Sequence, residues 1–291
     1  MNIAKRKIQS AEEAKKALEA SKDEASKKEL EAEIFQNLVD SKLYQPSTKW
    51  LFENNQCDTT EPVFMYLKKQ KWLDEESSLV EQRLTQMYIL PDVLPPGVVL
   101  DAKLNVDFGG EVFPGTKVDP ATTQTEPKIS IDCFHKEFKK YTLVMVDPDH
   151  PAPEIQNYRE KFHWAICNIS VNAASKEYVN GDVLLKYIPP HPAQGTKFHR
   201  YTFVLLEQPE DATPSTIQQA LEASDATVRS LVEKHGFVAR GLHFFRAEWS
   251  PAVSAIYKDA FGIPEPVFGP RPIVDPRIGP DGRIRNKYHN A

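Results

Sequence analysis

Five polar residues form the strongest candidate for a site that does chemistry, because each stands beside an apolar run of strand length. They are Asp147, Asp149, His163, His199 and Tyr201. Imidazole and phenol groups can together hold a phosphate-like or carboxylate anion, and a nearby aspartate can fix a histidine tautomer or keep it charged. The residue types therefore allow a small anion pocket, although composition alone favours an alternative. The alternative is a set of buried polar groups that satisfy one another and the turns around them.

The segments that position these residues have the pattern of β-strands. Residues 141–146, 164–169 and 201–206 are apolar runs of strand length, and 98–108 alternates apolar and polar side chains in part. Turn residues separate the runs, as in an antiparallel sandwich or barrel. Among these strands the sequence also predicts a helix near 215–235, capped by Ser215 or Thr216, and another at 251–261.

Composition divides the chain into three predicted parts. Residues 1–94 form a helical N-terminal extension, 95–262 a β-rich domain, and 263–291 an extended arm. Residues 3–30 are rich in Ala, Lys and Glu, which are strong helix formers. Their apolar side chains are mostly alanines, so this helix needs a partner surface to remain ordered.

Basic side chains gather near both ends of the chain. The candidates for docking on RNA or a partner protein are Lys5, Arg6, Lys7, Arg271, Arg277, Arg283, Arg285 and Lys287. Six prolines accompany the basic residues after position 262. A segment of this composition cannot build a core and is expected to become ordered on a partner.

Charge and motif content exclude several classes of protein. The formal net charge of −5 over 291 residues argues against a uniformly basic nucleic-acid binder, and no DNA partner is expected. No apolar run approaches the length of a membrane span, so no membrane insertion is expected. The sequence contains no GxSxG, HExxH or GxxxxGK[ST] motif, so we predict no enzymatic activity, no metal and no cofactor. Three cysteines without a CxxC pair favour a reducing compartment.

Several ordered motifs resemble the phosphatidylethanolamine-binding protein family. They are the stretches 141–151, 163–169, 195–201 and 247–249. The resemblance implies a mainly β fold, a sandwich of antiparallel sheets, with an anion pocket made by the five polar residues named above. Two positions depart from the family pattern. His191 begins a stretch that is usually Gly-Pro-Pro, and Lys197 replaces a usual glycine, so we expect His191 to narrow or fill the mouth of the pocket.

The flanking segments resemble one branch of this family, which belongs to the large subunit of the mitochondrial ribosome. The similar stretches are 61–64, 71–72, 82–87, 90–95, 241–264 and 267–268. The resemblance implies a non-enzymatic structural component in the mitochondrial matrix, in contact with large-subunit rRNA and neighbouring ribosomal proteins and supporting mitochondrial translation. The alternative is a soluble regulator of kinases or proteases that binds an anion or a phospholipid headgroup. The long flanks favour the ribosomal interpretation.

Overall fold

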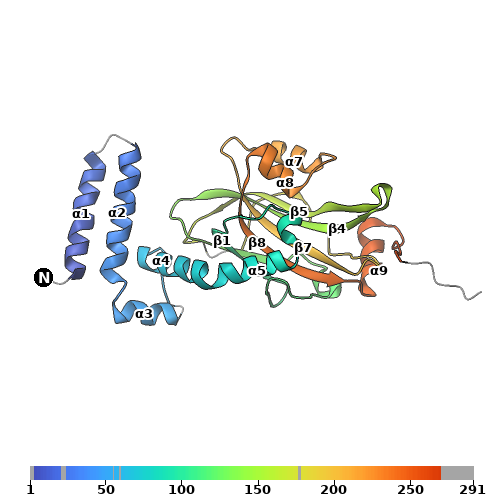
Figure 1. Cartoon of the computed structure of the whole chain (residues 1–291), viewed down its shortest axis with the longest axis horizontal. Helices are drawn as coiled ribbons and strands as arrows, with labels where there is room; N and C mark the ends of the chain where they lie inside the picture. Colours follow the sequence, from blue (N-terminus) through green and yellow to red (C-terminus); the bar gives the residue numbers. More distant parts are fainter. Residues whose placement is uncertain (1–2, 21–23, 55, 59, 176–177, 270–291) are drawn as a thin grey trace, which may run out of the picture.

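The computed structural model describes residues 3–20, 24–54, 56–58, 60–175 and 178–269. It shows a β-sandwich joined to a helical N-terminal extension (Figure 1). The extension contains α1 (Ile3–Ala20), α2 (Glu24–Lys42), α3 (Pro46–Glu53), α4 (Pro62–Lys71), the π-helical η1 (Trp72–Glu76), α5 (Ser77–Gln86) and α6 (Ile89–Asp92). The five basic residues predicted for the C-terminal arm lie outside the described residues.

Two antiparallel sheets form the sandwich, as the sequence predicts. One sheet has the order β2-β1-β3 and the other the order β6-β5-β4-β7-β8. The strands are β1 (Ala102–Asp107), β2 (Glu111–Val112), β3 (Lys128–Cys133), β4 (Lys139–Ala152), β5 (Asn157–Val171), β6 (Asp182–Leu185), β7 (Phe198–Glu207) and β8 (Val238–Glu248). Short 3-10 turns occur at η2 (Pro120–Thr123) and η3 (Pro153–Ile155).

The larger sheet is buried on both faces, which explains its continuous apolar strands. In β4, Leu143 and Met145 face the cluster between the two sheets, whereas Val144 and Val146 face a second cluster on the opposite side. Alternate residues of a strand point to opposite faces, so a strand covered on both sides needs apolar residues at every position.

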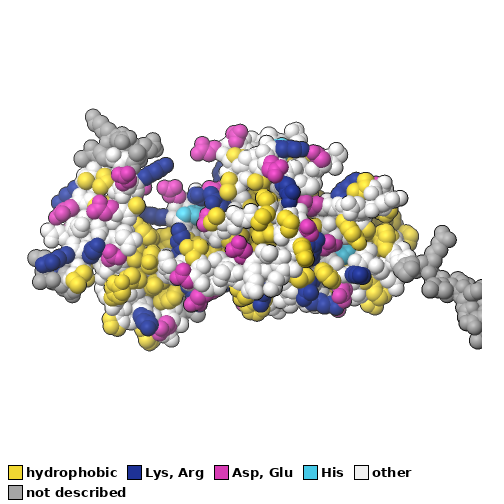
Figure 2. Space-filling model, in the orientation of Figure 1, with side chains coloured by type: hydrophobic (Ala, Val, Ile, Leu, Met, Phe, Trp, Pro, Cys, Tyr) yellow, Lys and Arg dark blue, Asp and Glu magenta, His cyan; other side chains and the backbone are white. Residues whose placement is uncertain are grey.

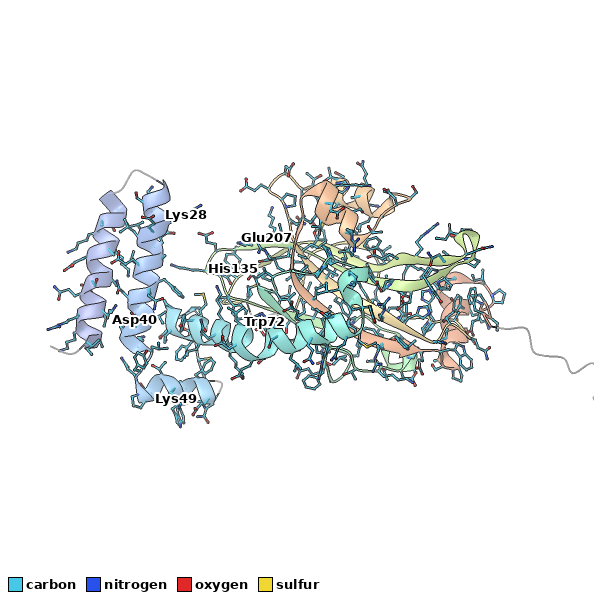
Figure 3. All side chains as sticks on the ribbon, in the orientation of Figure 1. Lys28, Asp40, Lys49, Trp72, His135 and Glu207 are labelled. Carbon is cyan, nitrogen blue, oxygen red and sulfur yellow. The ribbon has the colours of Figure 1, made fainter. Side chains whose placement is uncertain are left out.

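The alanine-rich first helix packs against the second helix of the same chain. Helices α1 and α2 lie side by side as a hairpin (Figure 1), and Ala11 and Ala14 are buried. Lys7 of α1 forms an ion pair with Asp40 of α2 at 3.0 Å, and Asp40 is labelled in Figure 3. Small side chains allow the two helices to approach closely, so the hairpin buries a surface that a single helix would leave in water.

The second half of the extension packs into the core of the sandwich. The indole N–H of Trp72 donates to the Leu100 carbonyl at 2.7 Å, and Leu84 and Ile89 share a cluster with Val204 of β7. Figure 3 shows Trp72 where the helices of the extension meet the sheets. The predicted division near residue 94 therefore crosses a continuous hydrophobic cluster.

The segment expected to form one helix near 215–235 is divided into two. These are α7 (Pro214–Glu222) and α8 (Val228–His235), followed later by α9 (Ala252–Ile256) and the π-helical η4 (Tyr257–Phe261). Thr213, not Ser215 or Thr216, is the cap of α7, and Thr227 caps α8. Each threonine side chain accepts a backbone N–H of the new helix, so a second capping box begins a second helix.

Candidate functional site

Three adjacent strands bring four of the five predicted pocket residues together. Asp147 lies on β4, His163 on β5, and His199 and Tyr201 on β7, and these are the central strands of the larger sheet. All four residues are buried. Their strands end at the same side of the sheet, so residues far apart in sequence share one small polar centre.

Asp147 and His199 form the charged part of this centre. The Asp147 carboxylate lies 2.7 Å from His199 Nδ1, and the other ring nitrogen lies 2.8 Å from Thr196 Oγ1. Because the Thr196 hydroxyl also donates to the Ala193 carbonyl, both nitrogens of His199 are placed to donate. Burial raises the pKa of Asp147, but the adjacent imidazole outweighs it and holds that pKa below its usual value. The aspartate therefore fixes the orientation of the His199 ring through this hydrogen bond.

His163 provides an acceptor that is not used within the described protein. Its Nδ1 donates to the Ile188 carbonyl at 2.9 Å. Burial lowers its pKa to about 4, so the ring is neutral at pH 7 and Nε2 carries a lone pair. That atom is buried and has no hydrogen-bond partner among the described residues. Tyr201 lies beside it with 5.2 Å between ring centroids.

The imidazole of His191 occupies the space in front of His163 and Tyr201. Its ring centroid lies 4.9 Å from that of His163 and 4.9 Å from that of Phe261, and the residue is 3% exposed. The backbone N–H of His191 donates to the Tyr201 hydroxyl at 3.1 Å. Glycine, which the family pattern has at this position, would leave that volume open.

Hydrogen bonds hold the His191 ring in place on both sides. Its Nδ1 donates to the Pro189 carbonyl at 2.7 Å, and Nε2 accepts from Lys161 Nζ at 2.9 Å. Burial lowers the pKa of His191 to about 2, so it remains neutral. The ring is therefore held by two hydrogen bonds in the space beside His163 and Tyr201.

The segment after η4 closes the same side of the pocket. The Phe268 N–H donates to the Gln194 carbonyl at 2.8 Å, and the Gln194 N–H donates to the Glu265 carboxylate at 3.0 Å. Gly195 has φ +91°, and a Cβ there would lie 1.3 Å from the Phe268 carbonyl oxygen. Only glycine permits this contact. Outside the closure remains a cavity of about 240 Å³ lined by His150, Lys161 and apolar side chains.

The backbone N–H of Asp149, the fifth predicted pocket residue, donates to Asp147 Oδ1 at 2.9 Å, but its side chain makes its contacts elsewhere. Its carboxylate accepts two hydrogen bonds from the Arg200 guanidinium and a third from the Arg200 backbone N–H. Arg200 also donates to the Met87 carbonyl and to Asp92. Asp149 thus connects the sandwich to the end of the helical extension.

Sequence reasoning missed Arg200 and Lys161, although both adjoin residues that it selected. Lys161 precedes His163 by two positions on β5 and is the register partner of Asp147 on β4. Alternation along β5 places it on the same face as His163, so that spacing was the signal. Arg200 has an acidic partner 108 positions away in Asp92, a separation that no local pattern reveals.

The basic residues predicted for docking occupy different surroundings. Lys5 and Arg6 are exposed on α1, whereas Lys7 contacts Asp40 and Asn37 within the hairpin. Lys197, at the pocket rim, is exposed with φ +66°, a conformation that favours glycine. Within the described ranges there is no group of three His, Cys, Asp or Glu side chains arranged to hold a metal ion. No helix in that part of the chain is both long enough and apolar enough to span a bilayer.

The sequence of this chain is similar to a known family and to a ribosomal protein. A family model described as phosphatidylethanolamine-binding protein matches residues 97–243. The large ribosomal subunit protein mL38 of Schizosaccharomyces pombe is 26% identical over 236 residues, which are 79% of this chain and 76% of that protein.

A solved structure shares the fold of the sandwich. Carboxypeptidase Y inhibitor, in complex with its cognate proteinase, has a TM-score of 0.50 and 19% identity, covering 60% of this chain and 96% of that one. A phosphatidylethanolamine-binding protein from Plasmodium falciparum has a TM-score of 0.44 and 21% identity, covering 57% and 96%. At 19% identity, the similarity to the inhibitor shows a shared fold and nothing about function.

Proposed function

The chain belongs to the phosphatidylethanolamine-binding protein family, and we propose that it is a non-enzymatic structural component of the mitochondrial large ribosomal subunit. In this role it contacts large-subunit rRNA and neighbouring ribosomal proteins in the mitochondrial matrix and supports mitochondrial translation. Its helical extension, its sandwich and its basic arm act as the three contacting parts.

One observation carries the proposal: the similarity of this chain to the ribosomal relative extends beyond the family domain. The family model spans residues 97–243, whereas the match to mL38 extends over 236 residues. At least part of the flanking sequence is therefore shared with a protein named for the large ribosomal subunit. Flanks of this length would serve no purpose in a small headgroup-binding protein.

The filled pocket supports a structural role over a ligand-binding one. His191 and the segment that ends at Phe268 close the polar centre with groups from the same chain. A ligand would have to displace a buried ring that makes two hydrogen bonds. The pocket then serves as a joint that fixes the C-terminal segment to the sandwich.

The surface of the extension supports docking on neighbours. Figure 2 shows apolar side chains gathered on the part of the molecule that the extension forms. Tyr44 lies just before α3 and is 88% exposed, and Trp50 lies within α3 and is 56% exposed. Exposed aromatic side chains close together are typical of surfaces that bind another macromolecule. Lys5 and Arg6 are exposed on the same extension and can neutralise phosphates.

The soluble headgroup-binding regulator is the second candidate, and the unpartnered His163 Nε2 favours it. That buried atom would accept a hydrogen bond from a protonated ligand if His191 moved aside. The two functions differ in what loss of the chain does to the ribosome. We expect depletion to lower the amount of assembled large subunit and of mitochondrial translation products while the small subunit persists. Unchanged large-subunit levels after complete depletion would refute the ribosomal role.

A further inference from the structure

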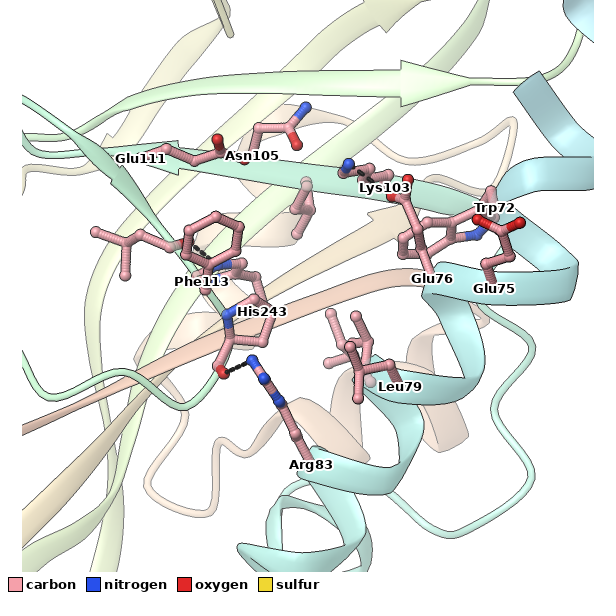
Figure 4. A pocket seen from close by; sticks show the side chains of 15 residues that line it. Trp72, Glu75, Glu76, Leu79, Arg83, Lys103, Asn105, Glu111, Phe113 and His243 are labelled. Carbon is pink, nitrogen blue, oxygen red and sulfur yellow. Dashed lines mark hydrogen bonds and ion pairs between the residues drawn. The ribbon is translucent and has the colours of Figure 1, made fainter.

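A second cavity, separate from the family pocket, lies where the helical extension crosses the sandwich. It has a volume of about 520 Å³ and lies between η1 and α5 on one side and β1, β2 and β8 on the other (Figure 4). We call it the extension groove, and its lining includes Trp72, Glu75, Leu79, Glu111, Phe113 and His243. Because one wall comes from the extension, the groove depends on that segment as well as on the family fold.

A buried histidine that lines this groove has an unused acceptor. The Nε2 of His243 donates to the Val112 carbonyl at 2.8 Å. Burial lowers the pKa of His243 to about 4, so at pH 7 the ring is neutral and Nδ1 carries a lone pair. Nδ1 is buried, and no hydrogen-bond partner for it exists among the described residues. A buried polar atom without a partner is costly, so a donor from outside would be favoured there.

The charged groups of the groove lead to the same conclusion. Lys103 is ion-paired with Glu76 at 2.7 Å, and Arg83 donates to the Pro114 carbonyl at 2.8 Å. Glu75 and Glu111, at opposite sides of the view in Figure 4, are exposed and have no ion pair within the described part of the chain. Lys103 is therefore neutralised by Glu76, Arg83 donates to the backbone, and the two carboxylates without an ion pair remain as acceptors.

Apolar side chains surround these acceptors. Leu79 is 48% exposed and Phe113 is 60% exposed, one on each wall of the groove. Phe113 offers an aromatic face on which a planar cation can stack. A ligand that suits the groove must combine several donors, a positive charge and apolar surface.

We propose that the extension groove binds an arginine-bearing segment of a neighbouring ribosomal protein, an inference that rests on the proposed function. A guanidinium carries five donors and flat apolar faces, which match the free carboxylates, the His243 acceptor and Phe113. RNA does not match, because its phosphates would face two unpaired carboxylates. The arginine segment crosses the groove between Glu75 and Glu111, with an apolar neighbour beside Leu79.

Site-specific photocrosslinking in the assembled subunit tests this proposal. The full-length chain carries a photoreactive phenylalanine analogue at Leu79, an exposed position that tolerates a larger side chain, and crosslinked peptides are mapped in purified large subunits. The expected product joins Leu79 to a segment of another ribosomal protein next to an arginine. The same analogue at Val183, which is 56% exposed on β6 outside the groove, should not reach that segment.

Charge reversal separates this site from general proximity. Glu75→Lys with Glu111→Lys should lower the yield of that crosslink about tenfold, which corresponds to about 1.4 kcal/mol of lost affinity. Glu210→Lys, an exposed change outside the groove, should leave the yield unchanged. Crosslinks to rRNA, to residues 270–291 of the same chain, or to nothing in subunits that contain the chain would overturn the groove proposal alone. Absence of the unaltered chain from large subunits would overturn the proposed function and this inference together.

Discussion

Asp149 binds Arg200 through two side-chain hydrogen bonds, Oδ1 to Nη2 at 2.7 Å and Oδ2 to Nε at 2.8 Å. The remaining amino group of the same guanidinium donates to the Met87 carbonyl and to Asp92, each at 2.8 Å. Two residues of the family motifs thus hold the end of the helical extension against the sandwich. The ion pair is mostly shielded, since the Arg200 side chain is 11% exposed.

Replacing Arg200 is therefore expected to be strongly destabilising. Arg200→Ala leaves Asp149 without its partner and removes both bonds to the extension. We expect the free energy of unfolding to fall by about 3 kcal/mol, the size typical of breaking a shielded ion pair. Urea denaturation of the full chain measures this change. Arg159→Ala is the matched control, because Arg159 pairs with Glu154 at an exposed site and should cost about 0.5 kcal/mol or less. Equal losses in the two variants would contradict the role of Arg200.

Stability should decrease as pH falls from 6.5 towards 4. His163 and His243 have an ordinary pKa of 6.5 when unfolded, and burial lowers each to about 4 in the folded chain. Over this interval the unfolded chain binds protons that the folded chain does not, so acid favours unfolding. Each histidine contributes a loss of up to about 1.4 kcal/mol per pH unit.

Urea denaturation at pH 7 and pH 5 measures this slope. His243→Asn should reduce the loss of unfolding free energy between pH 7 and pH 5 by the contribution of one histidine. His235→Asn, at an exposed position on α8, should leave that loss unchanged. A stability that stays constant or rises on acidification to pH 5 would show that these rings are not held neutral.

Opening the closed pocket should create a site for a protonated headgroup ligand. His191→Gly removes the ring in front of His163 and Tyr201 and restores the residue usual in the family. We expect the variant to bind phosphoethanolamine with at least about tenfold higher affinity than the unaltered chain, measured by isothermal titration calorimetry. The cavity should also cost about 2–4 kcal/mol of stability, so folding is checked by thermal denaturation.

Replacing His199 by Gln in the His191→Gly background is the control, and it should abolish the binding because the Asp147–His199 pair is lost. Comparable affinity in the unaltered chain would mean that His191 does not close the pocket, and the headgroup-binding alternative would then gain support.

The sandwich should remain folded when the first two helices are removed but not when the whole extension is removed. Truncation before α3 removes the α1–α2 hairpin and leaves the core cluster of Trp72, Leu84 and Ile89 covered. Truncation of residues 1–94 strips that cluster from Val204 and Leu206. We expect the first variant to be monomeric and cooperative in unfolding and the second to bind a hydrophobic dye and aggregate. A well-folded sandwich lacking residues 1–94 would show that the extension is an independent domain.

Much of the fold follows from patterns visible in the sequence. The runs 141–146 and 201–206 predict strands because a sheet covered on both faces requires apolar residues throughout. The division between α7 and α8 was missed because Thr227 restarts the helix through a cap, a local signal weaker than the apolar pattern around it. The resemblance to the family implied a sandwich of antiparallel sheets, but strand order was not predicted, since periodicity does not specify partners.

The sequence identified four residues that the structure brings together in the candidate site, but not all of the groups that close it. Sequence alone places Asp147, His163 and His199 beside apolar runs, although β4 and β5 continue past Asp147 and His163. The family resemblance gave the expectation that His191 narrows or fills the mouth. It does not reveal that Phe268 closes over Gly195, because that contact joins segments 73 positions apart. The partner of Asp149 was missed for the same reason, as Arg200 acts together with Asp92 far away in the chain.

Sedimentation of the tagged chain from mitochondrial lysate tests the central claim most directly. Gradient fractions are probed for large-subunit rRNA with and without chelation of Mg²⁺, which breaks up the subunit. The account predicts that the chain sediments with large-subunit rRNA in Mg²⁺ and leaves that position when Mg²⁺ is removed. A chain that stays at the top of the gradient under both conditions would contradict a ribosomal role.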